Sequence, residues 1–258
     1  MTVMCAPKTT CALSKGNKLH CFSKINQIKV DDEQTLSRLY LTLDVDWACD
    51  AVINSCADIF IAHKVPATWF ITHDSPVLER LREVEYFELG IHPNFNFLLN
   101  GDLRNGRCAE EVVDRLLALV PEATSVRSHS MTQSSVLIDL FSRKGLTHES
   151  NHFIPEQAGL ELKPWRHWVD MVKVPYFWED DVYCLSPENT PISELVYRKG
   201  LKVFDFHPIH VFLNSESMQR YDACRGFLMD PEALLNNVNH EVVGTKDLLL
   251  ELIGCSHD

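Results

Sequence analysis

Short apolar runs and amphipathic segments alternate along most of the chain. Short runs rich in β-branched and aromatic side chains are typical of strands, whereas apolar residues at three- and four-residue spacing are typical of helices. The pattern predicts strands over 39–44, 65–71, 87–91, 124–126, 146–149, 169–174 and 201–206. It predicts helices over 50–63, 75–85, 109–120, 134–144, 192–199, 231–238 and 246–253.

This alternation predicts one α/β domain. Strands that alternate with helices form parallel sheets with helices on their faces. The number of predicted strands favours a barrel-like arrangement over two separate domains. We expect residues 1–30 to be irregular, residues 31–258 to form the single domain, and residues 176–181 to form a loop.

The charge and the cysteines narrow the possible functions. The 258 residues carry a formal net charge of −12, which argues against general binding to nucleic acid or anionic membranes, because both need basic patches. The nine cysteines include no C-x-x-C spacing, which fits a reduced compartment. The N-terminus lacks the apolar segment of a secretory signal, and no stretch approaches the roughly 18 apolar residues of a membrane span. We therefore expect a cytoplasmic protein without a membrane span.

Two carboxylates follow the first predicted strand. Asp44 and Asp46 are two residues apart, so they project to the same side if the strand persists that far. They then lie at the carboxyl edge of the sheet, where open and barrel α/β folds place their chemistry. Two like charges side by side are costly unless a cation or a shared proton relieves them. The pair therefore favours a bound metal ion.

Three other strand ends carry polar motifs rich in histidine or arginine. His92 follows the strand at 87–91, Arg127 and His129 follow the strand at 124–126, and His207 follows the strand at 201–206. Imidazole and carboxylate groups together are the ligands that zinc and related divalent ions use. A histidine across the site from such an ion can also donate a proton at neutral pH.

The order of these motifs resembles that of the polysaccharide deacetylase (NodB-homology) superfamily of carbohydrate esterases. The resemblance covers most of residues 38–215. It rests on the sequences Thr-Leu-Asp-Val-Asp at 42–46, Ala-Thr-Trp-Phe-Ile at 67–71, Glu-Leu-Gly-Ile-His at 88–92, Arg127, and Phe-His-Pro at 206–208. His-Pro-Asn-Phe-Asn at 92–96 and Arg-Ser-His-Ser at 127–130 are most similar to the WbmS-type proteins linked to O-antigen synthesis.

The resemblance implies a fold and an activity. The fold is a distorted (β/α) barrel of about seven strands. The activity is the metal-dependent hydrolysis of an N-acetyl or related acyl group on an acetamido sugar, a nucleotide sugar or a glycan precursor for surface polysaccharide. By the same resemblance, Asp44 is the general base and Arg127 holds its carboxylate, Asp46 and His92 are metal ligands, and His207 is the general acid.

The chain departs from the superfamily pattern at the third metal ligand. The superfamily has a second histidine four residues after the first, and this chain has Asn96 there. An amide oxygen is a harder and weaker ligand than imidazole. Either Asn96 binds the metal, or His129 supplies the missing imidazole. Zn²⁺ is the expected ion, and Mn²⁺, Mg²⁺ or Ca²⁺ becomes favoured if Asn96 is the ligand.

Two residues of the irregular stretch are candidates for substrate binding. Trp178 and Asp180 follow a proline-containing segment, and an aromatic ring beside carboxylates suits a sugar subsite. Asp180 is also a candidate to orient Arg127. The alternative is a solvated acidic loop with one anchoring tryptophan.

Two further functions stay open. A catalytically impaired member of the superfamily would use the barrel to bind a sugar or a partner, as the substitution at Asn96 suggests. A metal hydrolase acting on a non-sugar amide would use the same residues.

Overall fold

The computed structural model describes residues 21–185 and 190–255 of the chain. Its strands are β1 (Phe22–Ser23), β2 (Leu39–Asp44), β3 (Ala67–Ile71), β4 (Phe87–Ile91), β5 (Ser125–Val126), β6 (His148–Glu149), β7 (Trp165–Arg166), β8 (Val172–Lys173), β9 (Trp178–Glu179) and β10 (Lys202–Phe206). Seven of these strands fall within the predicted strand segments, and β1, β7 and β9 were not predicted.

The helices separate most of these strands. The α-helices are α1 (Glu33–Ser37), α2 (Asp50–His63), α3 (Val77–Arg82), α4 (Asn96–Leu99), α5 (Ala109–Leu119), α6 (Ser135–Arg143), α7 (Asp180–Leu185), α8 (Ile192–Leu195), α9 (Pro208–Leu213), α10 (Met218–Cys224), α11 (Pro231–Leu235) and α12 (Thr245–Gly254). The 3-10 helices are η1 (Ile25–Gln27), η2 (His129–Met131), η3 (Glu156–Ala158) and η4 (Arg225–Phe227). Within the described residues, no helix is both long and apolar enough to cross a membrane.

The strands form one curled sheet. Its order is β7-β8-β6-β5-β4-β3-β2-β10-β9, with β1 added beside β2, and among the described strands only β7 runs antiparallel to its neighbour. The central strands β2, β3, β4 and β10 are fully buried, as expected for parallel strands covered on both faces. This is the distorted (β/α) barrel that the resemblance implied.

One continuous segment connects the two ends of the sheet. The chain pairs with β6 at β8, continues through a bridge between Phe153 and Tyr176, and then pairs with β10 at β9. The backbone amide of Val174 donates to the carbonyl of Glu149, which extends the contact beyond β8. The sheet is therefore drawn round into a barrel by residues 172–179.

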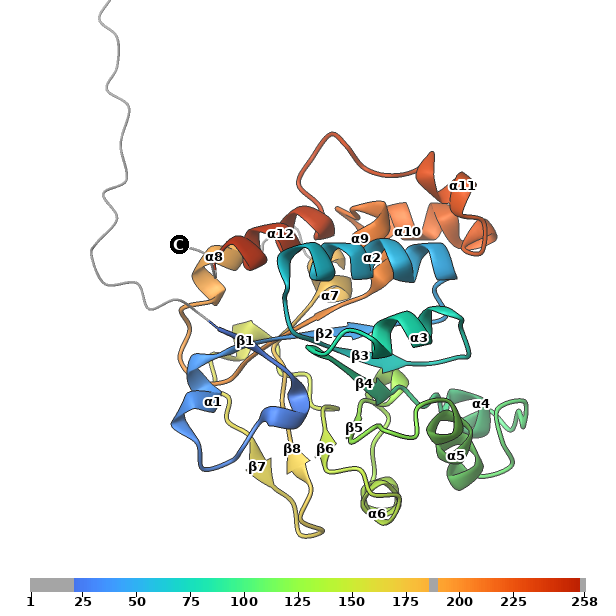
Figure 1. Cartoon of the computed structure of the whole chain (residues 1–258), viewed down its shortest axis with the longest axis vertical. Helices are drawn as coiled ribbons and strands as arrows, with labels where there is room; N and C mark the ends of the chain where they lie inside the picture. The colour runs from blue at the N-terminus through green and yellow to red at the C-terminus, as the bar shows by residue number, and fades with distance from the viewer. Residues whose placement is uncertain (1–20, 186–189, 256–258) are drawn as a thin grey trace, which may run out of the picture.

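Helices cover the outer faces of the sheet. Figure 1 shows α2, α9 and α12 together on one side of β2, with α5 and α6 on the opposite side of the molecule. The helix α2 begins and ends where the sequence predicts, and it buries Val52, Ile53, Cys56 and Phe60. All the arrows of β2, β3 and β4 in Figure 1 point the same way, so their carboxyl ends meet at one edge.

Two sequence expectations about irregular segments need correction. Residues 176–181 are not a loop, because they contain β9 and the start of α7. The expected irregular segment 1–30 lies outside the described residues up to position 20, but its last part is ordered and packed. Ile25 and Ile28 are buried, and β1 pairs with β2.

Candidate active site

Four strands of the sheet bring the predicted site residues to one edge. Asp44 ends β2, His92 follows β4, Arg127 follows β5 and His207 follows β10. The parallel register aligns these ends, since Phe206 pairs with Leu43 and Ile91 pairs with Val126. Residues that are 163 positions apart in the chain thus converge because the strands that carry them are adjacent.

Asp46, His92 and His129 form a compact cluster. One oxygen of Asp46, Oδ1, lies 3.2 Å from Nε2 of His92 and 3.1 Å from Nδ1 of His129. The ligand atoms of the three side chains all lie within 4.8 Å of one another. Burial raises the pKa of Asp46, but its hydrogen bonds with His129 and His92 outweigh this and hold the pKa well below its ordinary value.

The donor set of this cluster fits a divalent metal ion. Nε2 of His92 faces two carboxylates, at 3.2 Å from Asp46 and 3.6 Å from Asp44. An unprotonated ring nitrogen in that position would repel both oxygens, so it needs either its own proton or a cation between the groups. Two imidazoles and one carboxylate leave open positions on a four- or five-coordinate ion, which is the arrangement of catalytic zinc sites.

Asn96 is bonded to the turn that follows His129. It is the first residue of α4, and its side-chain amide donates a hydrogen bond to Oγ of Ser130 at 3.0 Å. The ring of His129 packs edge-on against two rings, those of Trp47 and His92. The structure therefore brings His129 together with Asp46 and His92, and it places the side-chain nitrogen of Asn96 on Ser130.

The turns that carry these ligands have unusual backbone conformations. Asp46 and Trp47 have φ values of 41° and 57°, and Ser130 and Met131 have φ values of 55° and 52°. Residues other than glycine rarely adopt this left-handed backbone conformation, and those that do cluster at functional sites. The backbone amide of Trp47 is held by the hydroxyl of Thr72, at 3.1 Å. The strand ends at Asp44, so it is this turn, and not a continued strand, that brings Asp46 beside Asp44.

Arg127 is a buried cation shared by two carboxylates. Its Nη1 donates to Oδ1 of Asp44 at 3.0 Å and also to Asp205 on β10. Its Nε donates to the carbonyl of Ser150, and its guanidinium stacks over Tyr176. Burial lowers the pKa of Arg127, but Asp205 and Asp44 outweigh this and raise it, so the residue stays charged. Arg127 thereby fixes the orientation of Asp44.

His207 is held by Asp180 and presents its other nitrogen to the cluster. Nδ1 of His207 lies 2.7 Å from Oδ1 of Asp180, and Nε2 lies 3.7 Å from Oδ2 of Asp46. Burial lowers the pKa of His207, but Asp181 and Asp180 outweigh this and hold it well above its ordinary value. A protonated ring at this position can donate from Nε2 toward the space beside Asp46.

The placement of Trp178 and Asp180 corrects two expectations. Trp178 is buried, with its ring centroid 4.9 Å from that of Phe206, and it does not line the space around Asp46, His129 and His207. Asp180 is fully buried and orients His207, not Arg127. The second carboxylate that pairs with Arg127, besides Asp44, is Asp205. The buried position of Asp180 leaves it no surface for substrate.

Several residues of the site escaped the sequence prediction. Asp205 interrupts the apolar run of β10, and this lone buried carboxylate was a usable signal. Asp181 pairs with His210 at 2.8 Å, and burial raises the pKa of Glu179 to about 7. The sequence positions of Asp181 and His210 do not predict that the two residues pair, because they lie on different helices, α7 and α9, that are distant in the chain.

Two cavities flank the cluster, and they share four lining residues, Asp46, His129, Asp181 and His207. The first, which we call the polar cavity, has a volume of about 300 Å³ and is also lined by Asp44, Arg127, Ser128, Ser130 and Glu179. The second, which we call the apolar cavity, has a volume of about 230 Å³ and is also lined by Trp47, Ala48, Ile209, His210, Met218, Tyr221 and Leu228.

Comparison with known proteins identifies the family. Residues 41–225 match the family described as WbmS-like polysaccharide deacetylase. The chain belongs to this family. A solved structure from Bordetella bronchiseptica, of a protein assigned as a polysaccharide deacetylase involved in O-antigen biosynthesis, is 40% identical with a TM-score of 0.82, over 90% of this chain and 97% of that one.

Two more distant structures resemble the WbmS-like chain. A protein from Mycobacterium smegmatis assigned as a polysaccharide deacetylase is 17% identical, with a TM-score of 0.47 over 95% of both chains. A polysaccharide deacetylase from Bacillus cereus is 16% identical, with a TM-score of 0.36 over 80% of this chain and 96% of that one. None of the curated proteins compared with the chain matches it.

Proposed function

We propose that this WbmS-like protein is a metal-dependent hydrolase that removes an N-acyl group, acetyl or a related acyl, from a sugar or glycan precursor. The observation that carries the proposal is the cluster of Asp46, His92 and His129. On either side of it lie the Asp44 carboxylate, held by Arg127, and the His207 imidazole, held by Asp180. Amide hydrolysis needs a base for the attacking water, a stabiliser of the carbonyl oxygen and an acid for the leaving nitrogen.

The ligand cluster would hold the metal. Asp46, His92 and His129 are the residues that would bind a divalent ion, with zinc favoured by two imidazole donors. When bound, the ion supplies Lewis acidity that polarises the acyl carbonyl and acidifies water.

The protein's own groups then divide the proton transfers. Asp44 faces the polar cavity and takes a proton from the attacking water, while Arg127 keeps its carboxylate oriented. His207 stands across the cluster, its ring fixed by Asp180, and donates a proton from Nε2 to the leaving nitrogen. Burial of Asp44 and His207 excludes bulk water from both positions.

The similarity to the Bordetella protein supports a role in O-antigen or other surface-polysaccharide biosynthesis. That protein is assigned to O-antigen biosynthesis, and the two chains align over nearly their whole length. We therefore propose an acetamido sugar, a nucleotide sugar or a lipid-linked glycan precursor as the class of substrate, acted on in the cytoplasm.

Metal content and amine release test this proposal together. We expect about one zinc or other divalent ion per chain by elemental analysis of the wild type, and its loss in His92→Ala. We expect release of free amine from acetamido sugars or their nucleotide conjugates by the wild type. Asp44→Asn, which keeps Asp46 and both histidines, should bind the metal and release no amine.

The outcome that would overturn the proposal is a wild-type protein that neither contains nor takes up metal. The second candidate, a non-catalytic barrel that binds a sugar, would then be favoured, because the cavities beside the cluster would remain. The departure at Asn96 is the observation that keeps this candidate open.

A further inference from the structure

The two cavities beside the ligand cluster differ in chemical character. The polar cavity offers Ser128, Ser130, Glu179 and the Arg127–Asp44 pair, and hydrogen-bonding groups of this kind suit the hydroxyls of a sugar ring. Beyond the four residues that the cavities share, the apolar cavity adds polar atoms from His210 and Tyr221, and the rest of its lining is aliphatic or aromatic: Trp47, Ala48, Ile209, Met218 and Leu228. The bond to be cleaved would cross from one cavity to the other at the shared residues.

The far wall of the apolar cavity is built from aliphatic and aromatic side chains. Met218 and Tyr221 come from α10, Leu228 comes from the segment after η4, Ile209 comes from α9, and Trp47 comes from the turn after β2. Met218, Tyr221 and Leu228 are all half-buried, and all three line the cavity. Tyr221 is fixed in place by its ring contact with His210, at a centroid distance of 5.2 Å.

The volume of the apolar cavity exceeds what an acetyl group needs. A water-sized atom group takes about 30 Å³ in a condensed phase. A cavity of about 230 Å³ therefore accommodates roughly seven such groups, whereas an acetyl group has three non-hydrogen atoms. An acetyl group would leave most of the wall formed by Met218 and Leu228 uncovered, and burial of a longer chain there would be favourable.

We propose that the physiological acyl group is longer than acetyl and that its tail lies in the apolar cavity, against Met218, Tyr221 and Leu228. This inference rests on the proposed function and names its substrate class, a sugar amine N-acylated with a short fatty chain of about four to six carbons.

The reaction is a simple hydrolysis of that amide. The oxygen of water forms a bond to the acyl carbon, and Asp44 takes one proton of the water. The bond between the acyl carbon and the nitrogen breaks, and His207 gives the nitrogen a proton. The products are the amino sugar and a free short-chain carboxylic acid. Directly after cleavage, the carboxylate product would still be bound with its tail in the apolar cavity.

Product carboxylates test the cavity without any knowledge of the sugar. We would titrate acetate, butyrate and hexanoate into the protein as isolated, following dissociation constants by NMR. We expect hexanoate to bind at least about tenfold more tightly than acetate, since added methylenes in an apolar pocket each favour binding. Equal affinities for acetate and hexanoate would overturn the inference.

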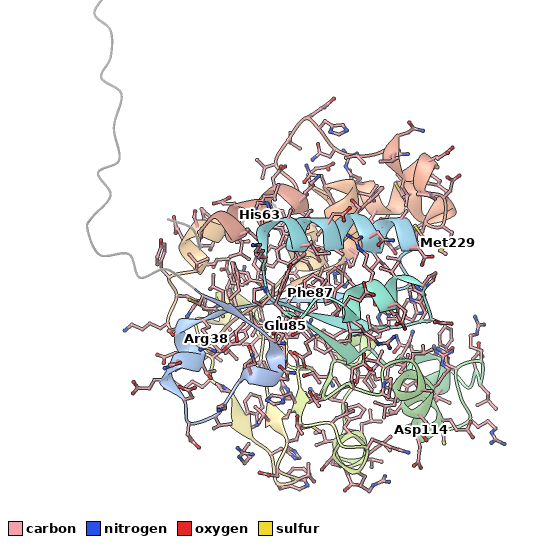
Figure 2. The ribbon with its side chains drawn as sticks, viewed as in Figure 1. Arg38, His63, Glu85, Phe87, Asp114 and Met229 are labelled. Carbon is pink, nitrogen blue, oxygen red and sulfur yellow. The ribbon has the colours of Figure 1, made fainter. Side chains whose placement is uncertain are left out.

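A matched pair of substitutions locates the effect. Met218→Trp narrows the apolar cavity, and it should abolish the preference for hexanoate while acetate still binds. Met229→Trp makes the same change at a residue that is 70% exposed and lies at the edge of the molecule (Figure 2), and it should leave the preference unchanged. A preference that persists in Met218→Trp would overturn the placement of the tail. Leu228→Phe provides a milder narrowing if Met218→Trp does not fold.

Amine release from N-acetyl-, N-butyryl- and N-hexanoylglucosamine extends the test to catalysis. We expect kcat/KM to rise with chain length in the wild type and in Met229→Trp, and to fall with it in Met218→Trp. Efficient release from the acetyl compound alone would overturn the inference and leave the proposed function standing. Release from none of them, with no metal bound, would instead count against the proposed function itself, and so would overturn the inference that rests on it.

Discussion

Asp180 holds His207 at two points. Oδ1 of Asp180 lies 2.7 Å from Nδ1 of the ring, and Oδ2 accepts a hydrogen bond from the backbone amide of His207 at 2.8 Å. Because the carboxylate is fully buried, the two contacts leave the ring one orientation, with Nε2 toward Asp46.

We expect Asp180→Asn to lower kcat by ~10², within the usual contribution of a general acid. An amide has a single acceptor oxygen, so it cannot serve both the ring and the backbone. Asp181 and Asp180 hold the pKa of His207 above its ordinary value. Loss of one charge lowers that pKa, and the alkaline limb of the rate profile should therefore move to lower pH. An alkaline limb that stays in place would show that His207 is not the acid.

His129 and Asn96 make opposite predictions for metal affinity. We expect His129→Ala to weaken zinc binding by at least ~10²-fold, since even changes around metal ligands cost about 10–100-fold. Asn96→Ala removes only a hydrogen bond to Ser130 and should change the affinity by a few-fold at most. Competition with a fluorescent zinc chelator measures both variants. The reverse ranking would make Asn96 the ligand.

The buried ion pair of Glu149 and Lys173 should contribute to the stability of the fold. Both side chains are almost completely buried, on the neighbouring strands β6 and β8. We expect Lys173→Met to lower the free energy of unfolding by about 3–5 kcal/mol, because it strands the carboxylate of Glu149. The double variant with Glu149→Leu should recover most of this loss, as measured by urea unfolding. A double variant no more stable than the single one would contradict this account.

Glu179 should make stability fall as pH rises. Burial raises its pKa from 4.5 to about 7 in the folded protein. The protonated form is the one that the fold favours, so this contribution is complete below pH 4.5 and is lost as the pH rises through 7. Glu179→Gln stays neutral and should gain stability relative to wild type, on the order of 1–2 kcal/mol, between pH 5 and 8.

Urea unfolding of wild type and Glu179→Gln, at one pH near each end of this range, measures the difference in their free energies of unfolding. The exposed Glu194→Gln on α8 is the matched control and should shift stability equally at both values. A gain for Glu179→Gln that is independent of pH would contradict the assignment.

The sequence predicted the long, regular elements well. The strands β2 and β4 and the helix α2 lie where the apolar periodicity indicated, because each is buried along its whole length or along one face. The register of parallel strands then follows, which is why Asp44, His92, Arg127 and His207 could be expected at one edge.

The short elements and the partners of the site residues could not be predicted in the same way. The strand β9 has two residues, Trp178 and Glu179, too few to show any periodicity. The choice between Asn96 and His129 depends on the direction of two turns with left-handed backbone, which no spacing encodes. The actual partners, Asp205 for Arg127 and Asp180 for His207, depend on which elements lie next to one another in the fold, since Asp205 is on β10 and Asp180 begins α7.

The pairing of β2 with β10 has a consequence for synthesis on the ribosome. Leu39 pairs with Lys202 and Leu43 with Phe206, so an early strand waits for one made more than 150 residues later. Until then the β2 edge is unpaired, and Arg127 and Asp44 lack the wall that buries them. Contacts so distant in sequence fold slowly and leave strand edges open to aggregation. A nascent chain stalled before residue 206 should therefore remain protease-sensitive, and the catalytic edge should form only after β10 has left the exit tunnel.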